Sequence, residues 1–383
     1  MAEVRKLIDD AARLLQARDA ASARKLLDQA AALEPANVQV RMQQALACRM
    51  VGDHDAALVA IDAALASDPY DFLALLSKAT IFDTKGELKA AAQIYRNALK
   101  IAPSNPPPAL KAPIERARRV VAEDAEAIHA FFRDAVKDLR AKHAGADLAR
   151  FEESLDIFAG KAKPHVPEPA YFLFPRLAPL PFFPREHFPW LAQLEGATDI
   201  IRGECEAVMR EDWAKFHPYI QFPAGAPVNQ WAQLNHSEAW STFHLWRDGA
   251  QQAENCARCP QTTEILASLP MADQPGFAPT AMFSVLQPKT RIPPHTGSSN
   301  TRVIVHLPLI LPPDCHYRVG NDHRDWKMGE AWVFDDTIEH EAVNDSDEVR
   351  VLLIFDVWNP FLTPAERELV GALMNARNAY LKA

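Results

Sequence analysis

The sequence is poor in cysteine, in basic residues and in long apolar runs, and each shortage excludes a class of protein. Five cysteines in 383 residues are too few, and odd in number, for a disulfide-stapled secreted domain, which favours a reducing compartment. Acidic residues outnumber basic ones by 50 to 41, and the net charge of −9 argues against a general binder of nucleic acid or of anionic membranes. No apolar run reaches the roughly 18 residues that span a bilayer, and the N-terminus lacks an apolar signal-peptide core. The sequence therefore predicts a cytoplasmic protein.

A 34-residue repeat runs through the first hundred residues. Pro35, Pro69 and Pro103 recur at this spacing, and Gly52 and Gly86 share it. Alanines recur in the same register: Ala45 and Ala79; Ala57 and Ala91; Ala30, Ala64 and Ala98. Small residues let two helices approach closely, the glycine serves the turn between them, and the proline ends the second helix. This pattern resembles the tetratricopeptide repeat family, in three units over about residues 4–105.

The resemblance to tetratricopeptide repeats leaves two roles open for this region. Three repeats are the practical minimum for a stable stack, which either binds a partner protein through its concave face or packs against a neighbouring domain. The first repeat departs from the pattern, since Arg18 stands where the glycine falls in the other two. An unrelated alanine-rich helical bundle is the alternative, but it leaves the coincident columns unexplained.

Three consecutive prolines, Pro106 to Pro108, separate the repeats from the rest of the chain. Amphipathic spacing predicts helix over residues 109–159, which caps the last repeat or bridges to the next domain. Residues 164–189 are rich in proline and aromatics, and this composition predicts an extended segment wrapped over an apolar surface. A helix is expected over residues 190–215, and a last helix is expected to start at Pro364.

Alternating apolar runs predict several strands after residue 280, over residues 281–286, 302–311 and 349–358. Turn signals such as Val319-Gly-Asn-Asp322 separate the runs. Several antiparallel strands within about 80 residues are typical of a sandwich or jelly-roll barrel.

Three histidines, His295, His306 and His340, lie in or beside these strands. Neutral imidazoles that face a barrel interior can ligate a divalent transition metal at about 2.0–2.1 Å. His295 and His340 are 45 residues apart, which is too far for the two histidines of a helical zinc motif but fits ligands from two strands of one barrel. The sequence therefore favours a metal site built by these strands.

Four short segments give this prediction its specificity. They are His295-Thr-Gly-Ser-Ser-Asn-Thr-Arg302, His306-Leu-Pro-Leu309, Phe334-Asp-Asp-Thr-Ile-Glu-His-Glu341, and Arg350 with Asp356-Val-Trp-Asn-Pro360. In this order they closely resemble the aspartyl/asparaginyl β-hydroxylase family, over about residues 238–363. The resemblance implies an iron(II)- and 2-oxoglutarate-dependent oxygenase on a double-stranded β-helix. Some relatives also join tetratricopeptide repeats to this catalytic domain, so each of the two resemblances supports the other.

The resemblance implies that His295 and His340 are the catalytic residues that ligate iron(II). Many 2-oxoglutarate oxygenases supply a third ligand as the carboxylate of a His-x-Asp motif. Gly297 stands at that place here, and the family that this chain resembles also has glycine there. The missing anionic ligand is expected to lower the affinity for the metal without excluding catalysis.

The resemblance also implies a binding site for the co-substrate 2-oxoglutarate. Arg350 matches the residue that pairs with its distal carboxylate, a role that suits the fixed fork of guanidinium donors. Ser284 matches the hydroxyl that assists Arg350. His306 matches the residue near the other carboxylate, which chelates the iron together with the 2-oxo group, and molecular oxygen binds the remaining position.

Two residues depart from the pattern of the best-known relatives. Met282 and Ile304 stand where those relatives have basic residues, in the region that handles the charge of the substrate or co-substrate. This puts the acidic peptide substrate of those relatives in doubt. Arg302 lies on the same strand face as Ile304 and is expected to compensate in part, as a further co-substrate-binding residue.

Other metal-ligand types in the sequence have simpler interpretations. His316 and His323 are expected in an exposed turn region, where a histidine is a structural residue more often than a ligand. Cys256 and Cys259 form a Cys-x-x-Cys pair, but no second pair follows at zinc-finger spacing, which favours a loop with incidental thiols.

Together these patterns predict an α+β multidomain protein. We expect tetratricopeptide repeats over residues 1–108, a helical bridge over 109–165 and a jelly-roll oxygenase domain over 166–383. The predicted function is hydroxylation of a C–H bond, at the β-carbon of an Asp- or Asn-type residue in a peptide or protein, with release of succinate and CO2. The alternatives are a repeat scaffold with a non-catalytic ligand-binding barrel, and a zinc or manganese enzyme without 2-oxoglutarate, which leaves Arg350 unexplained. The sequence does not distinguish a peptide from a small metabolite or lipid as substrate.

Overall fold

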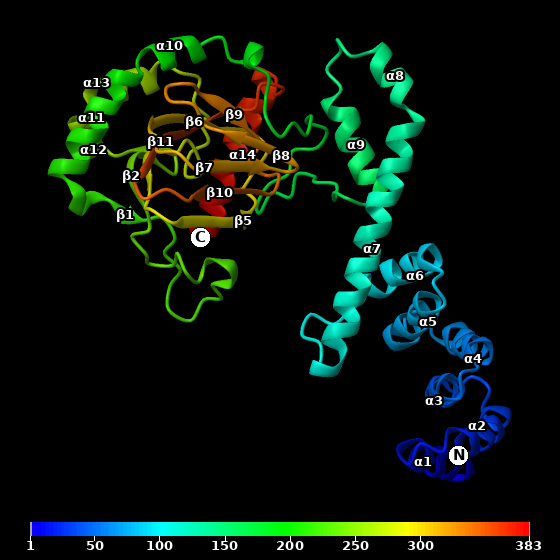
Figure 1. The fold of residues 1–383 in the computed structure, drawn as a ribbon. Helices are drawn as coiled ribbons and strands as arrows, with labels where there is room; N and C mark the ends of the chain where they lie inside the picture. Colours follow the sequence, from blue (N-terminus) through cyan, green and yellow to red (C-terminus); the bar gives the residue numbers. More distant parts are fainter. Residues whose placement is uncertain (1, 383) are drawn as a thin grey trace. The chain divides into compact units, whose positions relative to one another are not determined.

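The computed structural model describes residues 2–382. Within this part of the chain, the contacts define two compact units, which join between Lys163 and Pro164. The first unit is built of helices, coloured blue to cyan in Figure 1, and the second is built around strands coloured yellow to red.

Six helices of the first unit form three successive helical hairpins, as the 34-residue repeat predicts. They are α1 (Ala2–Gln16), α2 (Ala20–Leu33), α3 (Val38–Met50), α4 (His54–Ser67), α5 (Phe72–Thr84) and α6 (Leu88–Lys100). The repeated alanines are buried between helices: Ala30, Ala57, Ala64, Ala79, Ala91 and Ala98 have no exposed surface. Gly52 and Gly86 take positive φ angles of 80° and 77° in the turns, and Arg18 takes 62° at the matching position. The first repeat therefore keeps the turn of the other two, although arginine adopts this conformation less readily than glycine.

Three further helices complete the first unit: α7 (Pro108–Ala135), α8 (Lys137–Lys142) and α9 (Ala149–Ala159). Helix α7 packs against α6, and Arg116 of α7 donates to both carboxylate oxygens of Asp83 on α5, at 2.9 and 2.7 Å. Tyr95 of α6 donates to the same carboxylate. The predicted helical segment after the three prolines is confirmed, and it extends the helical stack.

The second unit begins with an extended segment and short helices that precede the sheets. Helices α10 (Leu191–Gly196) and α11 (Thr198–Glu211) replace the single helix expected over residues 190–215, because the chain bends at Ala197. Helices α12 (Ala253–Arg258) and α13 (Pro260–Ala267) follow the first long strand, and α14 (Pro364–Lys382) ends the unit. The last helix starts at Pro364 as predicted, with Thr363 and Glu366 hydrogen-bonded to each other.

Within residues 164–382, the strands form two antiparallel sheets. The larger contains β1 (His217–Pro218), β2 (Trp240–Arg247), β4 (Ala281–Leu286), β11 (Arg350–Trp358), β6 (Arg302–Ile310) and β9 (Trp332–Phe334) in that spatial order, with β3 (Ala250–Gln251) paired to β2. The smaller has the order β5 (Thr290–His295), β10 (His340–Asn344), β7 (Cys315–Val319) and β8 (Asp322–Asp325). The expectation of an antiparallel β domain after the repeats is confirmed.

The alternation of side chains along β4, β6 and β11 separates two apolar cores. Odd-numbered residues such as Phe283, Val305 and Leu353 pack against α10 to α13, which lie along the outer side of the sheet in Figure 1. Even-numbered residues point the other way, and Leu286 and Leu352 share a core with the smaller sheet. This alternation is the period of two that an antiparallel strand imposes. Chemistry-bearing residues with even numbers therefore face the space between the sheets.

The extended segment over residues 164–189 wraps the edge of this sandwich, as its composition predicts. The backbone N–H groups of Ala170 and Tyr171 donate to the carbonyls of Gly297 and Ser298, at 2.9 and 3.0 Å. Further along, Phe182 pairs with Phe334 of β9, and its ring is buried.

Two smaller expectations are corrected. His316 and His323 are exposed, but they lie on the paired strands β7 and β8 rather than in a turn, and His316 contacts Asp325 at 2.8 Å. Cys256 lies in α12, and Cys259 is the first residue after this helix. Both thiols are buried in the core that the larger sheet forms, so they are not in an exposed loop. Among residues 2–382, no helix combines the length and the apolar character needed to cross a bilayer.

The buried side chain of Asn344 joins the two sheets. Its amide donates to the carbonyls of Leu286, Gln287 and Glu348, and its carbonyl accepts from Ser346. Replacing this side chain leaves several buried backbone carbonyls without a donor, and each such loss costs about 1–3 kcal/mol.

We expect Asn344→Leu to lower the free energy of unfolding by about 2–3 kcal/mol. All eight tryptophans lie in the second unit, so denaturant unfolding followed by tryptophan fluorescence reports on this unit. Asn375→Ala, at an exposed position of α14, is the control and should stay within about 0.5 kcal/mol of the natural chain. A loss of under about 0.5 kcal/mol in Asn344→Leu would contradict the role of this side chain.

Candidate active site

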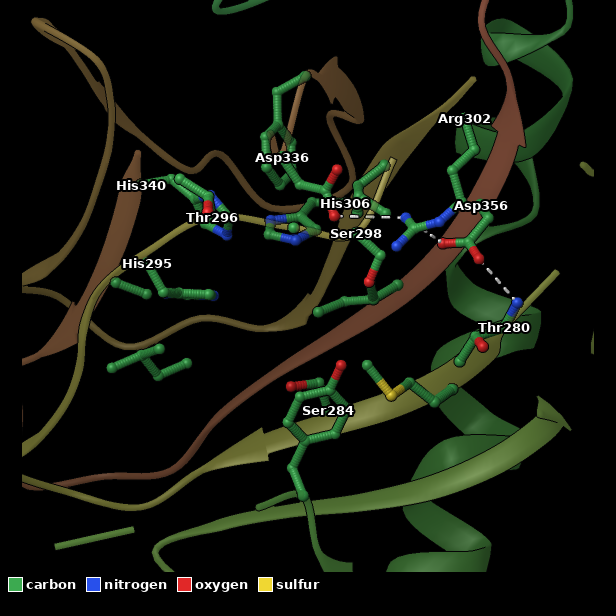
Figure 2. Close-up of a pocket in the computed structure, with 18 of the residues that line it drawn as sticks. Thr280, Ser284, His295, Thr296, Ser298, Arg302, His306, Asp336, His340 and Asp356 are labelled. Carbon is green, nitrogen blue, oxygen red and sulfur yellow. Dashed lines mark hydrogen bonds and ion pairs between the residues drawn. The ribbon is translucent and has the colours of Figure 1, made fainter. Parts of the chain in front are cut away.

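A cavity of about 560 Å³ lies between the two sheets. Its walls bring together all the site residues that the sequence predicts: Ser284, His295, Arg302, His306, His340 and Arg350. Ser284, Arg302, His306 and Arg350 come from the larger sheet, and His295 and His340 come from the smaller one. Figure 2 shows the labelled side chains, among them His295, His306 and Arg302, converging on one space.

A bulge in β5 places His295 opposite His340. In regular pairing Ile292 lies across from Ala342, but the next aligned pair is His295 with His340, so β5 holds one residue more than β10 between these points. The extra residue reverses the alternation, because neighbouring strand residues point to opposite faces. Without it, His295 would point away from the cavity that Ile292 faces. Pro293 and Pro294 occupy the bulge, where the missing N–H groups of proline are tolerated.

Both imidazoles are held in the same way by the backbone. Nδ1 of His295 lies 2.8 Å from the carbonyl of Pro293, and Nδ1 of His340 lies 3.0 Å from the carbonyl of Ile338. A carbonyl only accepts, so each Nδ1 carries the proton and each Nε2 keeps a lone pair. The two ring centroids are 4.0 Å apart. The two rings therefore lie next to each other in the cavity, each with a lone pair on Nε2.

Burial keeps these imidazoles neutral. It lowers the pKa of His295 to about 3, assisted by the neighbouring His340, and it lowers the pKa of His340 to about 4. A neutral imidazole is the form that binds a metal. Among residues 2–382, no group of three or more His, Cys, Asp or Glu side chains is arranged to hold a metal, so the two histidines are a pair without a third protein ligand of these types.

The carboxylate of Asp336 fills the space over Gly297. A Cβ on Gly297 would lie 2.0 Å from Oδ2 and 2.2 Å from Cγ of Asp336, well inside van der Waals contact. Oδ1 of Asp336 is buried and has no hydrogen-bond partner. An acidic side chain at position 297 would have to displace another carboxylate, which already lies beside His295.

Arg302 is held between two carboxylates at the back of the cavity. Its Nη1 lies 3.3 Å from Asp336 and 3.1 Å from Asp356, and Asp356 also accepts from the backbone N–H of Thr280. Figure 2 shows this chain of contacts as dashed lines. Burial raises the pKa of Asp356 to about 6, against the opposing effect of Arg302. Arg302 is thus already matched by acidic groups of its own chain.

Arg350 differs from Arg302, because it is buried without any carboxylate partner in the described part of the chain. It is 1% exposed, and its Nε and Nη2 have no hydrogen-bond partner. Its guanidinium carbon lies 5.1 Å from the centre of the Trp326 ring, and none of the acidic residues within 2–382 forms an ion pair with it. Burial without a counter-ion lowers the pKa of Arg350 to about 10. A buried cation of this kind is costly unless a ligand supplies the anion.

Ser284 and His306 flank Arg350 on neighbouring strands. Ser284 pairs with Leu352 of β11, two residues from Arg350, and its Oγ accepts from Nε1 of Trp240 at 3.0 Å. The hydroxyl proton of Ser284 therefore stays available for another acceptor. His306 is buried, its Nδ1 has no partner, and burial followed by the charge of Arg350 lowers its pKa well below the ordinary value.

The floor of the cavity beside these groups is apolar. Ile354 of β11 pairs with Met282 on one side and with His306 on the other, and Ile304 lies on the same face. Met282 and Ile304 are buried, at 5% and 8% exposure. The two departures from the basic residues of relatives therefore both lie on the cavity wall.

The sequence reasoning did not assign roles to Asp336, Asp356, Tyr171 and Arg377, all of which line the cavity. Two of these residues could have been found from the sequence, since Asp336 and Asp356 belong to the segments that carry the family resemblance. Tyr171 and Arg377 lie far from those segments in the chain, and only the folded structure brings them to the cavity. His236 and the buried Cys256 lie elsewhere, with partners in the backbone.

We expect Gly297→Ala to displace the Asp336 carboxylate and to lower the free energy of unfolding by about 1–3 kcal/mol, because the added methyl overpacks a buried site. Tryptophan fluorescence in denaturant measures this. Gly203→Ala in α11 is the matched control, since its Cβ meets nothing within 4 Å and alanine favours a helix. Equal stability of the two variants would contradict this prediction and would show that Asp336 moves aside without cost.

The second unit is similar in sequence to known hydroxylases. The family model for aspartyl/asparaginyl beta-hydroxylase matches residues 195–360, and that for the tetratricopeptide repeat matches residues 10–72 and 51–106. The human aspartyl/asparaginyl beta-hydroxylase is 32% identical over 182 residues, which are 47% of this chain and 22% of that protein. The aspartate beta-hydroxylase domain-containing protein 2 of Xenopus tropicalis is 31% identical over 217 residues, covering 55% of this chain and 56% of that protein.

A bacterial relative is covered more fully. The ornithine lipid ester-linked acyl 2-hydroxylase of Rhizobium tropici is 32% identical over 206 residues, which are 53% of this chain and 68% of that protein. Among solved structures, the tetratricopeptide domain of Sgt2 from Aspergillus fumigatus aligns with a TM-score of 0.30 and 22% identity, over 32% of this chain and 82% of that one. The chain thus spans 22% and 56% of the human and Xenopus relatives. It carries tetratricopeptide repeats and belongs to the aspartyl/asparaginyl β-hydroxylase family.

Proposed function

We propose that this protein is an iron(II)- and 2-oxoglutarate-dependent dioxygenase that hydroxylates a C–H bond and releases succinate and CO2. The observation that carries the proposal is the buried Arg350, which has no counter-ion and shares one cavity with two neutral imidazoles. A dicarboxylate co-substrate supplies the missing anion, and a metal uses the imidazoles. The family membership supports the hydroxylation reaction.

His295 and His340 fit a divalent iron ion. Their Nε2 lone pairs are directed by the backbone bonds of Nδ1, a support that metal-bound histidines commonly have. Two imidazoles without a carboxylate leave several positions for co-substrate, oxygen and water. Bound there, iron(II) supplies the activation of oxygen, which no protein side chain provides. Asp336 adds a buried acceptor next to the two rings.

Arg350, Ser284 and His306 fit 2-oxoglutarate. The guanidinium of Arg350 offers two unpartnered buried nitrogens to a carboxylate, and the hydroxyl of Ser284 is free to donate beside it. In the apolar surroundings of Leu352 and Trp326, such charge-assisted hydrogen bonds are strong. His306 lies between Arg350 and the histidine pair, where it can contact the other end of the co-substrate.

The proposed reaction site on the substrate is the β-carbon of an Asp- or Asn-type residue in a peptide or protein. The lipid named for the Rhizobium relative is the second substrate class that the apolar floor of Met282, Ile304 and Ile354 supports. The protein's residues exclude water from this floor and hold the co-substrate, so that the reactive species meets the substrate rather than solvent.

We further propose that the repeats bind a peptide or partner protein. A groove of about 520 Å³ lies over α3 and α5, lined by residues that include Met42, Leu46 and Leu73. Gln43 also lines this groove, and its side-chain oxygen is buried without a hydrogen-bond partner. The five cysteines are free and buried, which supports a reducing, cytoplasmic location.

His340→Ala and His295→Ala should each abolish succinate formation, with at least about a 100-fold loss of iron affinity, since each removes one of only two protein ligands. Anaerobic titration with iron(II) and 2-oxoglutarate should give the visible charge-transfer band of the chelate in the natural protein and not in the variants. His316→Ala, an exposed histidine away from the cavity, is the control. Succinate formation retained by metal-stripped His340→Ala would refute the proposed function.

Arg350→Ala should raise the KM for 2-oxoglutarate roughly 10- to 100-fold, because charged hydrogen bonds contribute about 1.5–3 kcal/mol. The unliganded variant should be no less stable than the natural protein, because an uncompensated buried charge is removed. Thermal unfolding with and without 2-oxoglutarate tests both points, since the co-substrate should stabilise only the natural protein. An unchanged KM would place the distal carboxylate elsewhere.

A further inference from the structure

Two residues at the mouth of the cavity come from outside the part of the chain that matches the hydroxylase family. Tyr171 and Arg377 both line the cavity, whereas the family match covers residues 195–360. Both side chains are exposed, and the guanidinium carbon of Arg377 lies 5.6 Å from the centre of the Tyr171 ring. The mouth is therefore lined in part by residues from outside the segment that the family model matches.

The backbone around Tyr171 is fixed by hydrogen bonds to the loop that follows His295. The N–H groups of Tyr171 and Phe172 both donate to the carbonyl of Ser298, and that of Ala170 donates to Gly297. Ser298 is three residues from His295 and itself lines the cavity. The position of Tyr171 is thus tied to the strand end that carries His295.

The helix that carries Arg377 is anchored to the loop that contains Pro275 and Gly276. Asn378 of α14 donates to the carbonyl of Pro275 at 2.8 Å, and Gly276 has no space for a side chain, since a Cβ would meet Nδ2 of Asn378 at 2.2 Å. Val370 and Met374 of α14 are buried. The helix therefore packs tightly on the loop that contains Phe277, and Arg377 has a defined place.

Phe277 connects the mouth to the interior. Its ring packs edge-on against Tyr171, with the centroids 6.3 Å apart, and Arg302 lies over it with the guanidinium carbon 5.9 Å from the ring centre. Two neighbouring aromatic rings thus lie between two cations, with Arg302 at the buried end and Arg377 at the exposed end. Each cation gains from the electron-rich face of a ring.

The two cations of this column differ in their acidic partners. Arg302 is matched by Asp336 and Asp356, whereas no carboxylate within residues 2–382 forms an ion pair with Arg377. Asp248 also lines the cavity and lies 3.9 Å from Arg247. Arg377, at the mouth, therefore has no acidic partner among the residues described. Arg302, deeper in the cavity, already has two.

We propose that Arg377 and Tyr171 form a specificity subsite that binds the carboxylate of an elongated substrate, several bonds away from the carbon that is hydroxylated. Of the reacting groups proposed above, this subsite goes with an uncharged one, an Asn-type residue or an acyl chain rather than an Asp, because the reacting segment lies against Met282, Ile304 and Ile354 and next to an arginine that is already neutralised. This proposal rests on the proposed function, and it names the substrate class of the same cavity. An acidic peptide and an N-acyl amino acid both have this chemistry.

The test uses the full-length protein loaded with iron(II) and 2-oxoglutarate and two sets of paired probes. One set consists of short peptides with a central asparagine and a glutamate at graded distances, each paired with its glutamine form. The other consists of N-acylglycines of graded chain length, each paired with its glycinamide. Mass spectrometry detects the added oxygen and gives KM and kcat for every probe, so the two sets distinguish the peptide from the acyl source.

We expect a carboxylate probe to have a KM about fivefold below that of its amide pair, the effect of about 1 kcal/mol that a partly exposed ion pair contributes. Arg377→Gln should remove this difference by raising the KM of the acid alone, with kcat and the KM for 2-oxoglutarate unchanged. Added salt should reduce the preference in the same way. Arg210→Gln, an exposed arginine of α11 that pairs with Glu211, is the matched control.

Three results would overturn the inference. They are equal KM values for acids and amides, a preference for acids that survives in Arg377→Gln, and hydroxylation of no acid in either set by protein that gives the charge-transfer band and forms succinate. Absence of the band and of succinate from the natural protein would instead refute the proposed function, and the inference with it.

Discussion

The single extra residue in β5 decides whether His295 and His340 face each other in this cavity. Strand alternation alone would turn His295 outwards, and the bulge at Pro293 and Pro294 turns it towards His340. The extended segment before the sheets then pairs with the loop that comes after His295, which fixes Tyr171 at the mouth. The pairing of the histidines, the enclosure by the segment and the position of the mouth therefore all depend on the register of one strand.

The two buried arginines of the cavity differ in how their charge is compensated. Arg302 is matched by Asp336 and Asp356 within the protein, and it contributes a rigid wall. Arg350 is buried with two nitrogens that have no hydrogen-bond partner. Its buried charge is therefore an unfavourable desolvation term in the folded protein. Two arginines of one cavity thus differ, because one is compensated by carboxylates of the chain and the other is not.

Much of the fold followed from local patterns, because those patterns reflect local physics. The 34-residue spacing predicted the helical hairpins, and Ala30, Ala64 and Ala98 fall at their contacts. Ser284 and His306 were predicted from the resemblance to the hydroxylase family, and strand alternation placed Arg302 on the same face as Ile304. The pairing of Arg302 with Asp356 and the approach of Arg377 could not be predicted in this way, since they join residues separated by dozens or hundreds of positions. The break at Ala197 was missed because the apolar pattern continues across it.

Both imidazoles are oriented by a backbone carbonyl two residues earlier in the chain, that of Pro293 in β5 for His295 and that of Ile338, just before β10, for His340. A carbonyl belongs to the backbone, so no exchange of side chain at either position removes the acceptor. Proline and isoleucine serve equally, although they share no functional group. Most substitutions near these positions therefore leave the orientation of each ring unchanged. The orientation is lost only when the path of the backbone changes. Insertions and deletions near residues 293 and 338 are therefore more dangerous to this centre than substitutions.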